Sequence, residues 1–444
     1  MFFGVLCMAR LIFERMIKLM NRIIFVIFIS SSVIMACHPA NKLAKTTGDT
    51  ILRDTILEEL LKKYPSYFDS ILTRREAYGV QIIYTQIDRD KNNNPELTDH
   101  YYNVNPKKYF YPASTVKLPV ALLSLQKLNE LNIKGLDKYS TMITNAGYTG
   151  QTEVFNDPTT ADGRPNIAHY IKKIFLVSDN DAFNRLYEFL GQEYINQSLS
   201  RKGYDDAQII HRLNISLPED QNRQTNPVKF FDSAANLVYE KPLQKSNLHY
   251  IPRDQKRGNG YYSGDKFINE PFDFSKKNQL SLPDLHRILR SVIFPSSVRK
   301  SQRFKLAQSD YNFLYKYMSI HPRESLYPSY DSSEYSDAYV KFILYGSGKA
   351  PMDDGIRIFN KVGDAYGFLT DVAYVVDFKN NIEFMLSATI YCNSDDIYND
   401  DKYDYDSIGF PFMKNLGKII YDYELTRARK NAPDLSAFKM EYKE

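Results

Sequence analysis

The sequence contains no tryptophan, and only three cysteines and seven histidines among its 444 residues. The histidines are scattered, and neither a Cys-x-x-Cys nor a His-x-x-x-His pair occurs, so we expect no metal site and no cofactor. Lysine and arginine total 57 against 53 acidic residues, and three of the four net positive charges lie in the first 36 residues. Because the remaining chain is nearly neutral, nucleic acid is excluded as an expected partner.

An apolar run, Ile23–Met35, follows the basic residues Lys18 and Arg22. It is short for a membrane-spanning helix and is typical of the core of a signal peptide. The run ends in Val-Ile-Met-Ala-Cys37, which resembles a bacterial lipobox. We therefore predict a lipoprotein-type signal peptide over residues 1–36 and lipid attachment at Cys37. The exported protein would be anchored to the membrane and would face the periplasm or the cell surface.

The lipoprotein interpretation also predicts where the chain starts and what state the cysteines are in. Met16 and Met20 are alternative starts to Met1, because the segment after Met20 is already a complete signal. Cys7 would be removed with the signal, which leaves Cys392 as a free thiol and predicts no disulfide within the chain. A polar tether, residues 37–50, would connect the lipid to a folded body, residues 51–444.

The body alternates between strand and helix patterns. Strand patterns occur near both ends of the chain and helical patterns lie between them, which predicts an α+β fold whose sheet joins the two ends. A polar stretch, about 240–350, indicates an insertion. The predicted elements are a helix over 51–75 broken at Pro65, a hairpin of 80–87 with 101–104, a helix over 114–131, two helices within 165–190, a hairpin of 371–377 with 382–391, and a helix over 410–429.

Ser114 and Lys117 stand three residues apart at the start of the helix predicted over 114–131. Residues at this spacing share one helix face, so the lysine can activate the serine as a nucleophile if burial lowers its pKa. A Ser-x-x-Lys match alone arises by chance about once in a couple of hundred residues. Here Pro112 precedes the helix and apolar residues flank Lys117, which gives the lysine the buried surroundings that a base requires.

The run from Tyr109 to Pro119 resembles the active-site segment of class A β-lactamases and related penicillin-binding proteins. The resemblance implies a β-lactamase/transpeptidase-like fold, with Ser114 as nucleophile and Lys117 as general base. Ser178-Asp179-Asn180 matches the second motif of this superfamily, in which the serine relays a proton and Asn180 holds the substrate amide and the lysine.

Lys361-Val362-Gly363 matches the third motif, a Lys-Thr/Ser-Gly run on an edge strand. By the same resemblance, Lys361 supplies positive charge and Gly363 allows the substrate backbone to lie close. The backbone N–H of Asp364 would complete an oxyanion hole with that of Ser114.

Two positions depart from the family. In class A enzymes a loop glutamate activates the water that removes the acyl group, and counting back from Asn214 places Ile210 in that position. His211, Glu219 and Asp220 are substitutes if the loop follows another path. Val362 lacks the hydroxyl that the family uses to bind a substrate carboxylate, and Arg357 is a weak replacement.

These features predict an exported serine hydrolase that forms an acyl-enzyme at Ser114 and acts on a small-molecule or peptide substrate. Hydrolysis of β-lactams, with slow release of the acyl group, is the first alternative. A penicillin-binding-type D,D-peptidase, or another amide or ester hydrolase of the envelope, is the second. A non-catalytic envelope binding protein on the same fold is the third.

Overall fold

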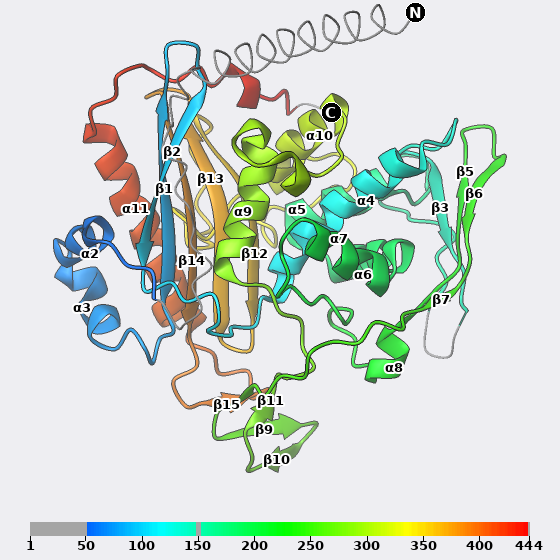
Figure 1. Ribbon diagram of the computed structural model, residues 1–444, viewed down its shortest axis with the longest axis horizontal. Helices are drawn as coiled ribbons and strands as arrows, with labels where there is room; N and C mark the ends of the chain where they lie inside the picture. The colour runs from blue at the N-terminus through cyan, green and yellow to red at the C-terminus, as the bar shows by residue number, and fades with distance from the viewer. Residues whose placement is uncertain (1–50, 148–151, 443–444) are drawn as a thin grey trace, which may run out of the picture. The chain divides into compact units, whose positions relative to one another are not determined.

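The computed structural model describes residues 51–147 and 152–442. Its centre is a five-stranded antiparallel sheet in which strands from the two ends of the chain lie side by side (Figure 1). The predicted α+β fold with a shared sheet is therefore confirmed. Across the sheet the strands are β12 (Ile356–Ala365), β13 (Phe368–Asp377), β14 (Ile382–Tyr391), β1 (Gln81–Arg89) and β2 (Pro95–Tyr102).

Two element boundaries differ from the sequence prediction. The strand predicted at 101–104 begins six residues earlier, at Pro95, because the outer half of edge strand β2 is largely solvent-facing and lacks an apolar signature. Pro65 does not simply end a helix: it is the first residue of α3 (Pro65–Thr73), after α2 (Thr55–Lys62). Proline suits this first position because its missing N–H would have no helical partner.

Both faces of the central sheet are covered, which explains why every residue of β13 is buried. α9 (Leu282–Ile293) packs on one face, where the His286 ring lies 2.8 Å from both Thr85 Oγ1 and Ser387 Oγ. The opposite face packs against α2, α3 and the C-terminal α11 (Phe410–Thr426) (Figure 1).

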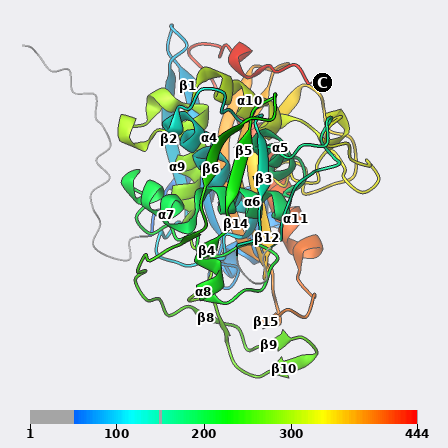
Figure 2. The same ribbon diagram turned by 90° about the vertical axis from the view of Figure 1, so that its right-hand side faces the viewer.

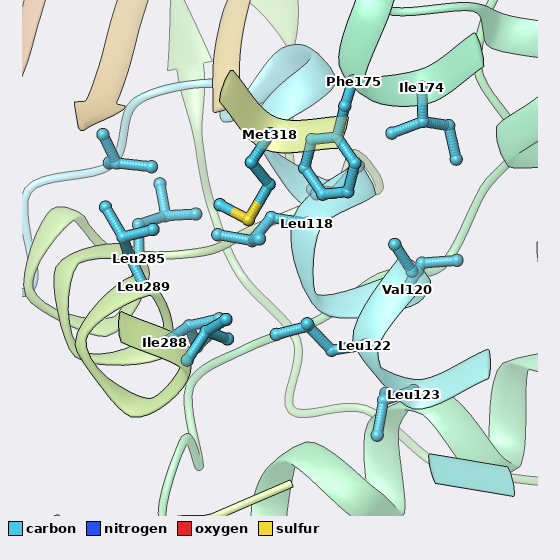
Figure 3. Packing of buried hydrophobic residues seen from close by; sticks show 14 of the residues in the cluster. Leu118, Val120, Leu122, Leu123, Ile174, Phe175, Leu285, Ile288, Leu289 and Met318 are labelled. Atoms are coloured by element: carbon cyan, nitrogen blue, oxygen red, sulfur yellow. The ribbon is translucent and has the colours of Figure 1, made fainter. Parts of the chain in front are cut away.

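A helical block lies beside the sheet and is built around α4 (Lys117–Leu131), which is buried on nearly all sides. Leu118, Val120, Leu122 and Leu123 of α4 lie among residues of α5, α9 and α10 in one core (Figure 3). Burial of a leucine or valine side chain stabilises the fold by about 1.5–3 kcal/mol, so this packing fixes the start of α4 firmly. The other helices of the block are α5 (Ile167–Val177), α6 (Asn180–Leu190), α7 (Gln192–Arg201), α10 (Gln308–Ser319) and the short α8 (Glu219–Asn222).

Small strands extend from this body in pairs and triplets (Figure 1). One group borders the helical block and the other forms a ribbon region near the β12–β13 turn. The first contains β3 (Thr141–Thr144), β5 (Val228–Phe231) and β6 (Leu237–Lys241), with β4 (Gln224–Thr225) paired to β7 (Gln244–Lys245). The second contains β8 (Lys256–Arg257), β11 (Phe272–Asp273), β9 (Gly260–Ser263), β10 (Lys266–Ile268) and β15 (Ile397–Tyr398).

The stretch 240–350, expected to be one insertion, consists of three different parts. Its middle holds α9 and α10, which contribute buried residues to the main core and cannot be an appendage. The sequence hid this role because polar residues alternate with the apolar stripe of each helix. The ribbon region and the segment after α10 also contribute buried residues to the core clusters, Phe274 in the first and Ala338 and Val340 in the second.

Cys392 is a buried thiol without a disulfide, and burial raises its pKa above that of an exposed cysteine. Within 51–147 and 152–442, the structure has no helix long and apolar enough to cross a membrane. The predicted signal peptide, the tether and Cys37 lie outside the described residues.

Candidate active site

Ser114 lies in a short 3₁₀ turn, Ala113–Val116, that leads directly into α4. Ala113 adopts a left-handed φ of +46°, a conformation that costs a non-glycine residue about 1–3 kcal/mol and often occurs at functional sites. Lys117 is the first residue of α4 and is fully buried. Its Nζ lies 2.8 Å from the Ser114 Oγ, so the predicted nucleophile and base are in hydrogen-bond contact.

The second motif is at the junction between α5 and α6. Ser178 ends α5 in a left-handed conformation, with φ of +59°, and Asp179 caps α6 by accepting a hydrogen bond from the Ala182 N–H. This sharp turn points both neighbouring side chains at Lys117. The Lys117 Nζ lies 3.2 Å from Ser178 Oγ, 2.7 Å from Asn180 Oδ1 and in contact with the Ser178 carbonyl oxygen.

The third motif lies on β12, the edge strand of the central sheet. The Lys361 Nζ lies 2.8 Å from Ser178 Oγ and 2.9 Å from its neighbour's carbonyl oxygen, Val362 O. The structure thus brings Ser114, Lys117, Ser178, Asn180 and Lys361 together from three separate parts of the chain. Ser178 Oγ connects the two lysines.

Gly363 brings the edge strand against the turn that carries the nucleophile. A Cβ at this position would lie 3.0 Å from the Ser114 backbone nitrogen, 2.9 Å from that of Thr115 and 2.7 Å from the Pro112 carbonyl oxygen. The close neighbour of Gly363 is therefore the protein's own backbone, whereas we expected a substrate backbone. Asp364 follows on the strand with an exposed side chain.

Four oxygen acceptors surround the Lys117 Nζ: Ser114 Oγ, Asn180 Oδ1, and the carbonyl oxygen and Oγ of Ser178. An ammonium offers only three N–H donors, whereas a neutral amine offers two donors and one lone pair. Either state therefore makes three of the four contacts, and in the neutral amine one of the three is a hydrogen bond from a serine hydroxyl to the lone pair. This is the geometry needed to remove a proton from Ser114.

Electrostatics favour the neutral amine. Burial lowers the pKa of Lys117 well below that of an exposed lysine, and the Lys361 charge lowers it further. Burial also lowers the pKa of Lys361 to about 7, against the opposing effect of the Asp364 and Asp371 charges. Near neutral pH, Lys117 can therefore act as a base while Lys361 keeps part of its charge.

A sequence model of the beta-lactamase enzyme family matches residues 69–423, which include all three motifs. The chain belongs to the beta-lactamase enzyme family. No curated protein matches the chain.

Solved structures of PBP-A and of several β-lactamases resemble the chain at low sequence identity. PBP-A is 14% identical, with 84% of this chain and 98% of PBP-A covered and a TM-score of 0.44. The class A beta-lactamase from Clostridium kluyveri is 14% identical, with coverages of 81% and 98% and a TM-score of 0.44. A beta-lactamase from Chitinophaga pinensis is 11% identical, with coverages of 83% and 99% and a TM-score of 0.45.

The loop backbone held next to the second motif is that of Leu213, three residues after Ile210. Asn184 lies one helical turn beyond Asn180 on α6, and it exchanges two hydrogen bonds, of 3.0 and 2.9 Å, with the Leu213 backbone. Ile210 is held elsewhere, by the Asn278 and Gln192 side chains. Counting back from Asn214 reaches Ile210, whereas the loop backbone bonded to Asn184 is at Leu213. Leu213 is buried and cannot accept a proton.

The other loop candidates each have partners of their own. Glu219 and Asp220 are exposed on α8 and form ion pairs with Arg223 and Lys245, respectively. The His211 ring stacks on Tyr111, with ring centroids 6.2 Å apart, and its Nδ1 lies 2.5 Å from its neighbour's carbonyl oxygen. No loop carboxylate therefore stands beside Lys117 in the described part of the site.

The two residues considered for binding a substrate carboxylate are both engaged in the interior. Val362 is buried in the cluster on the α11 face of the sheet. Arg357 is buried too, and it donates two hydrogen bonds, of 2.8 and 2.9 Å, to the Glu324 carboxylate. Arg357 is therefore a structural ion-pair partner, and the site has only Lys361 as a cation for a substrate anion among these candidates.

A separate group, His321, Glu324 and Asp354, has ligand atoms within 4.8 Å of one another, a spacing that could hold a metal ion. Arg357 and Arg323 already donate to the two carboxylates, at 2.8 Å each. This pairing leaves little negative charge for a cation, so the group is better explained as an ion-pair network.

Sequence reasoning missed Asn184 and the segment after α10. Asn184 could have been found, because it stands four residues after Asn180 and therefore shares a helix face with it. Residues 327–340 carried no motif, and their position beside the site depends on contacts with α5 and β12 that are distant in sequence.

Proposed function

We propose that this β-lactamase-family protein is a serine hydrolase that forms an acyl-enzyme at Ser114. Lys117, as a neutral amine, takes the hydroxyl proton while Oγ forms a bond to the substrate carbonyl carbon. The carbonyl electron pair moves to oxygen, where the N–H groups of Ser114 and Asp364 would stabilise it. Ser178 then gives its proton to the leaving nitrogen as the C–N bond breaks, and it is reprotonated from Lys117.

The position of Ser178 carries this proposal. Its Oγ lies 3.2 Å from the Lys117 Nζ and 2.8 Å from the Lys361 Nζ, while Lys117 also contacts the nucleophile. A proton removed from Ser114 therefore has a continuous path to a leaving group. A group of buried lysines and serines without this purpose would place charges in the interior at a cost of several kcal/mol.

For the substrate, we propose β-lactam amides with slow hydrolysis of the acyl-enzyme. The three motifs support acylation, whereas Leu213 leaves the release step without a carboxylate base. The same absence favours the second candidate, a penicillin-binding-type peptidase or related hydrolase of envelope amides and esters, in which the acyl group passes to a different acceptor. A non-catalytic binding role is the third candidate and predicts no adduct at all.

The test is a time course of intact mass after the soluble body, starting at His38, is mixed with a fluorescent penicillin. Ser114→Ala serves as the matched control. An adduct that decays over many turnovers supports a slow β-lactamase, and one that persists supports the penicillin-binding candidate. If neither penicillins nor activated esters label Ser114, the catalytic proposal is wrong.

We also propose that the protein is an exported lipoprotein attached to the membrane through Cys37, because a lipobox-like run precedes that residue. Cells that express the full chain with labelled palmitate should yield a labelled membrane-bound protein. Cys37→Ser should abolish both the label and the membrane fraction. Labelling that persists in the variant would contradict this proposal.

A further inference from the structure

A segment over residues 327–340, here called the tyrosine segment, runs between the two walls of the active site. At one end the Lys172 Nζ of α5 donates to the Tyr327 carbonyl oxygen at 3.2 Å. At the other end the Asn360 Nδ2 of β12 donates to the Val340 carbonyl oxygen at 2.9 Å. α5 ends at Ser178 and β12 carries Lys361, so the segment joins the elements that hold the second and third motifs.

The chain just beyond the tyrosine segment is anchored in the protein. The Asp371 carboxylate of β13 accepts hydrogen bonds from the backbone N–H groups of Phe342 and Ile343, at 3.2 and 3.0 Å. Gly346 and Leu344 pack against α11, close to Phe410 and Gly417, respectively. Figure 2 shows this region, in yellow, beside α5 and α11. The tyrosine segment is therefore held in place at the side of the site.

Three rings of this segment form a ladder. The centroids of Tyr330 and Tyr335 are 5.1 Å apart, and those of Tyr335 and Tyr339 are 5.0 Å apart at an interplanar angle of 68°. The Tyr330 hydroxyl is buried and has no hydrogen-bond partner within the described residues. Aromatic faces carry negative electrostatic potential, so a ladder of this kind attracts cations.

Two carboxylates of the active-site motifs lie near the ends of the ladder. Burial and the Asp179 charge raise the pKa of Tyr330, and burial and the Asp364 charge raise the pKa of Tyr339. The Lys173 Nζ lies 3.7 Å from Asp179 and balances part of its charge. Asp364 has an exposed side chain directly after the third motif. The Asp179 charge also raises the pKa of Tyr335, so both carboxylates act electrostatically on the ladder.

The site offers few groups that could bind a substrate carboxylate. Val362 and Arg357 are buried away from the site, as described above, and the Lys361 Nζ already contacts Ser178 Oγ and the Val362 carbonyl oxygen. A substrate that carries a carboxylate on this side would face Asp364 and the tyrosine faces. A substrate that carries an ammonium would find aromatic and carboxylate partners.

We propose that Tyr330, Tyr335 and Tyr339, with Asp364 and Asp179, form a subsite that selects acyl donors bearing a positively charged amino group. The inference rests on the proposed acyl-enzyme at Ser114, and it assigns a specificity role to part of the stretch 240–350. A cation over aromatic rings gains enough for a preference of about 3- to 30-fold over a neutral group.

The test uses three p-nitrophenyl esters of a six-carbon chain that ends in an amine, an acetamide or a carboxylate. The second-order rate of p-nitrophenol release is measured with the whole folded body, and the rate with Ser114→Ala is subtracted. We expect the amine ester to acylate Ser114 about 3- to 30-fold faster than the acetamide ester, and the carboxylate ester to be slowest. Tyr335→Ala and, independently, Asp364→Asn should reduce the amine-to-acetamide ratio toward one.

Tyr67→Ala is the matched control, because Tyr67 is an exposed, stacked tyrosine on α3, across the sheet from the helical block. It should leave the ratio unchanged. Release that depends on Ser114 but shows no preference, or that favours the carboxylate, overturns the subsite and leaves the proposed function intact. A penicillin adduct at Ser114 without Ser114-dependent release from any of the three esters also overturns the subsite, whereas failure of both the penicillin and the esters overturns the proposed function itself.

Discussion

Leu213→Glu should convert a persistent acyl-enzyme into one that is hydrolysed and returns to free enzyme. Asn184 holds the Leu213 backbone with two hydrogen bonds, one helical turn from the Asn180 side chain that contacts Lys117. We expect a carboxylate introduced there to face Lys117 and to take a proton from a water molecule. General-base catalysis contributes about 10²- to 10⁴-fold, so the half-life of the acyl-enzyme should shorten by that factor.

The structure also sets the stability cost of this change. Leu213 is 6% exposed, and removal of its buried side chain should lower the free energy of unfolding by about 1.5–3 kcal/mol. Leu213→Gln is the matched variant, because it has a similar size and cost but no carboxylate. Urea titrations of both variants show whether the fold is retained.

The assay is the decay of a fluorescent penicillin adduct after excess drug is removed. Leu213→Glu should accelerate decay, while Leu213→Gln and Ile210→Glu should not. Acceleration by Ile210→Glu alone would show that our description of the loop is wrong. Equal acceleration by Leu213→Gln would show that the carboxylate does not act as a base.

Three further predictions concern the motifs and the buried lysines. Gly363→Ala places a Cβ 3.0 Å from the Ser114 nitrogen, so acylation measured by stopped flow should slow at least about tenfold; an unchanged rate would contradict this packing. Because Lys361 has a pKa of about 7 and is charged below it, acylation by an anionic penicillin should fall as pH rises from 6 to 8, and Lys361→Gln should remove that dependence. Burial lowers the pKa of Lys341 to about 7, so between pH 7 and 10 this lysine binds a proton more readily in the unfolded chain than in the folded one. The free energy of unfolding should therefore rise with pH over this range, as measured by urea titrations. If Lys341→Met leaves that rise unchanged, Lys341 does not cause it.

The sequence was sufficient to predict the fold class and the three motifs. Ser114 and Lys117 are close in sequence, so helical spacing alone places them together. The strands near the two chain ends have clear apolar patterns because the sheet is covered on both faces. The pairing of Ser178 with Lys361 required the resemblance to the family, since 183 residues separate them.

The remaining features depend on tertiary contacts that no local pattern records. The Leu213 backbone exchanges two hydrogen bonds with Asn184, 29 residues away, a contact that counting along the loop cannot detect. α9 has polar residues around its apolar stripe, which concealed its place on the sheet. The tyrosine segment has no motif, and its position is defined by α5 and β12.

Peptide mapping after brief exposure to a penicillin tests whether Ser114 is the nucleophile. Tryptic cleavage after Lys108 and Lys117 releases residues 109–117, which contain Ser114. The account predicts one adduct on this peptide, at Ser114, and none in Ser114→Ala. Attachment to another residue, or an equal adduct in Ser114→Ala, would contradict it.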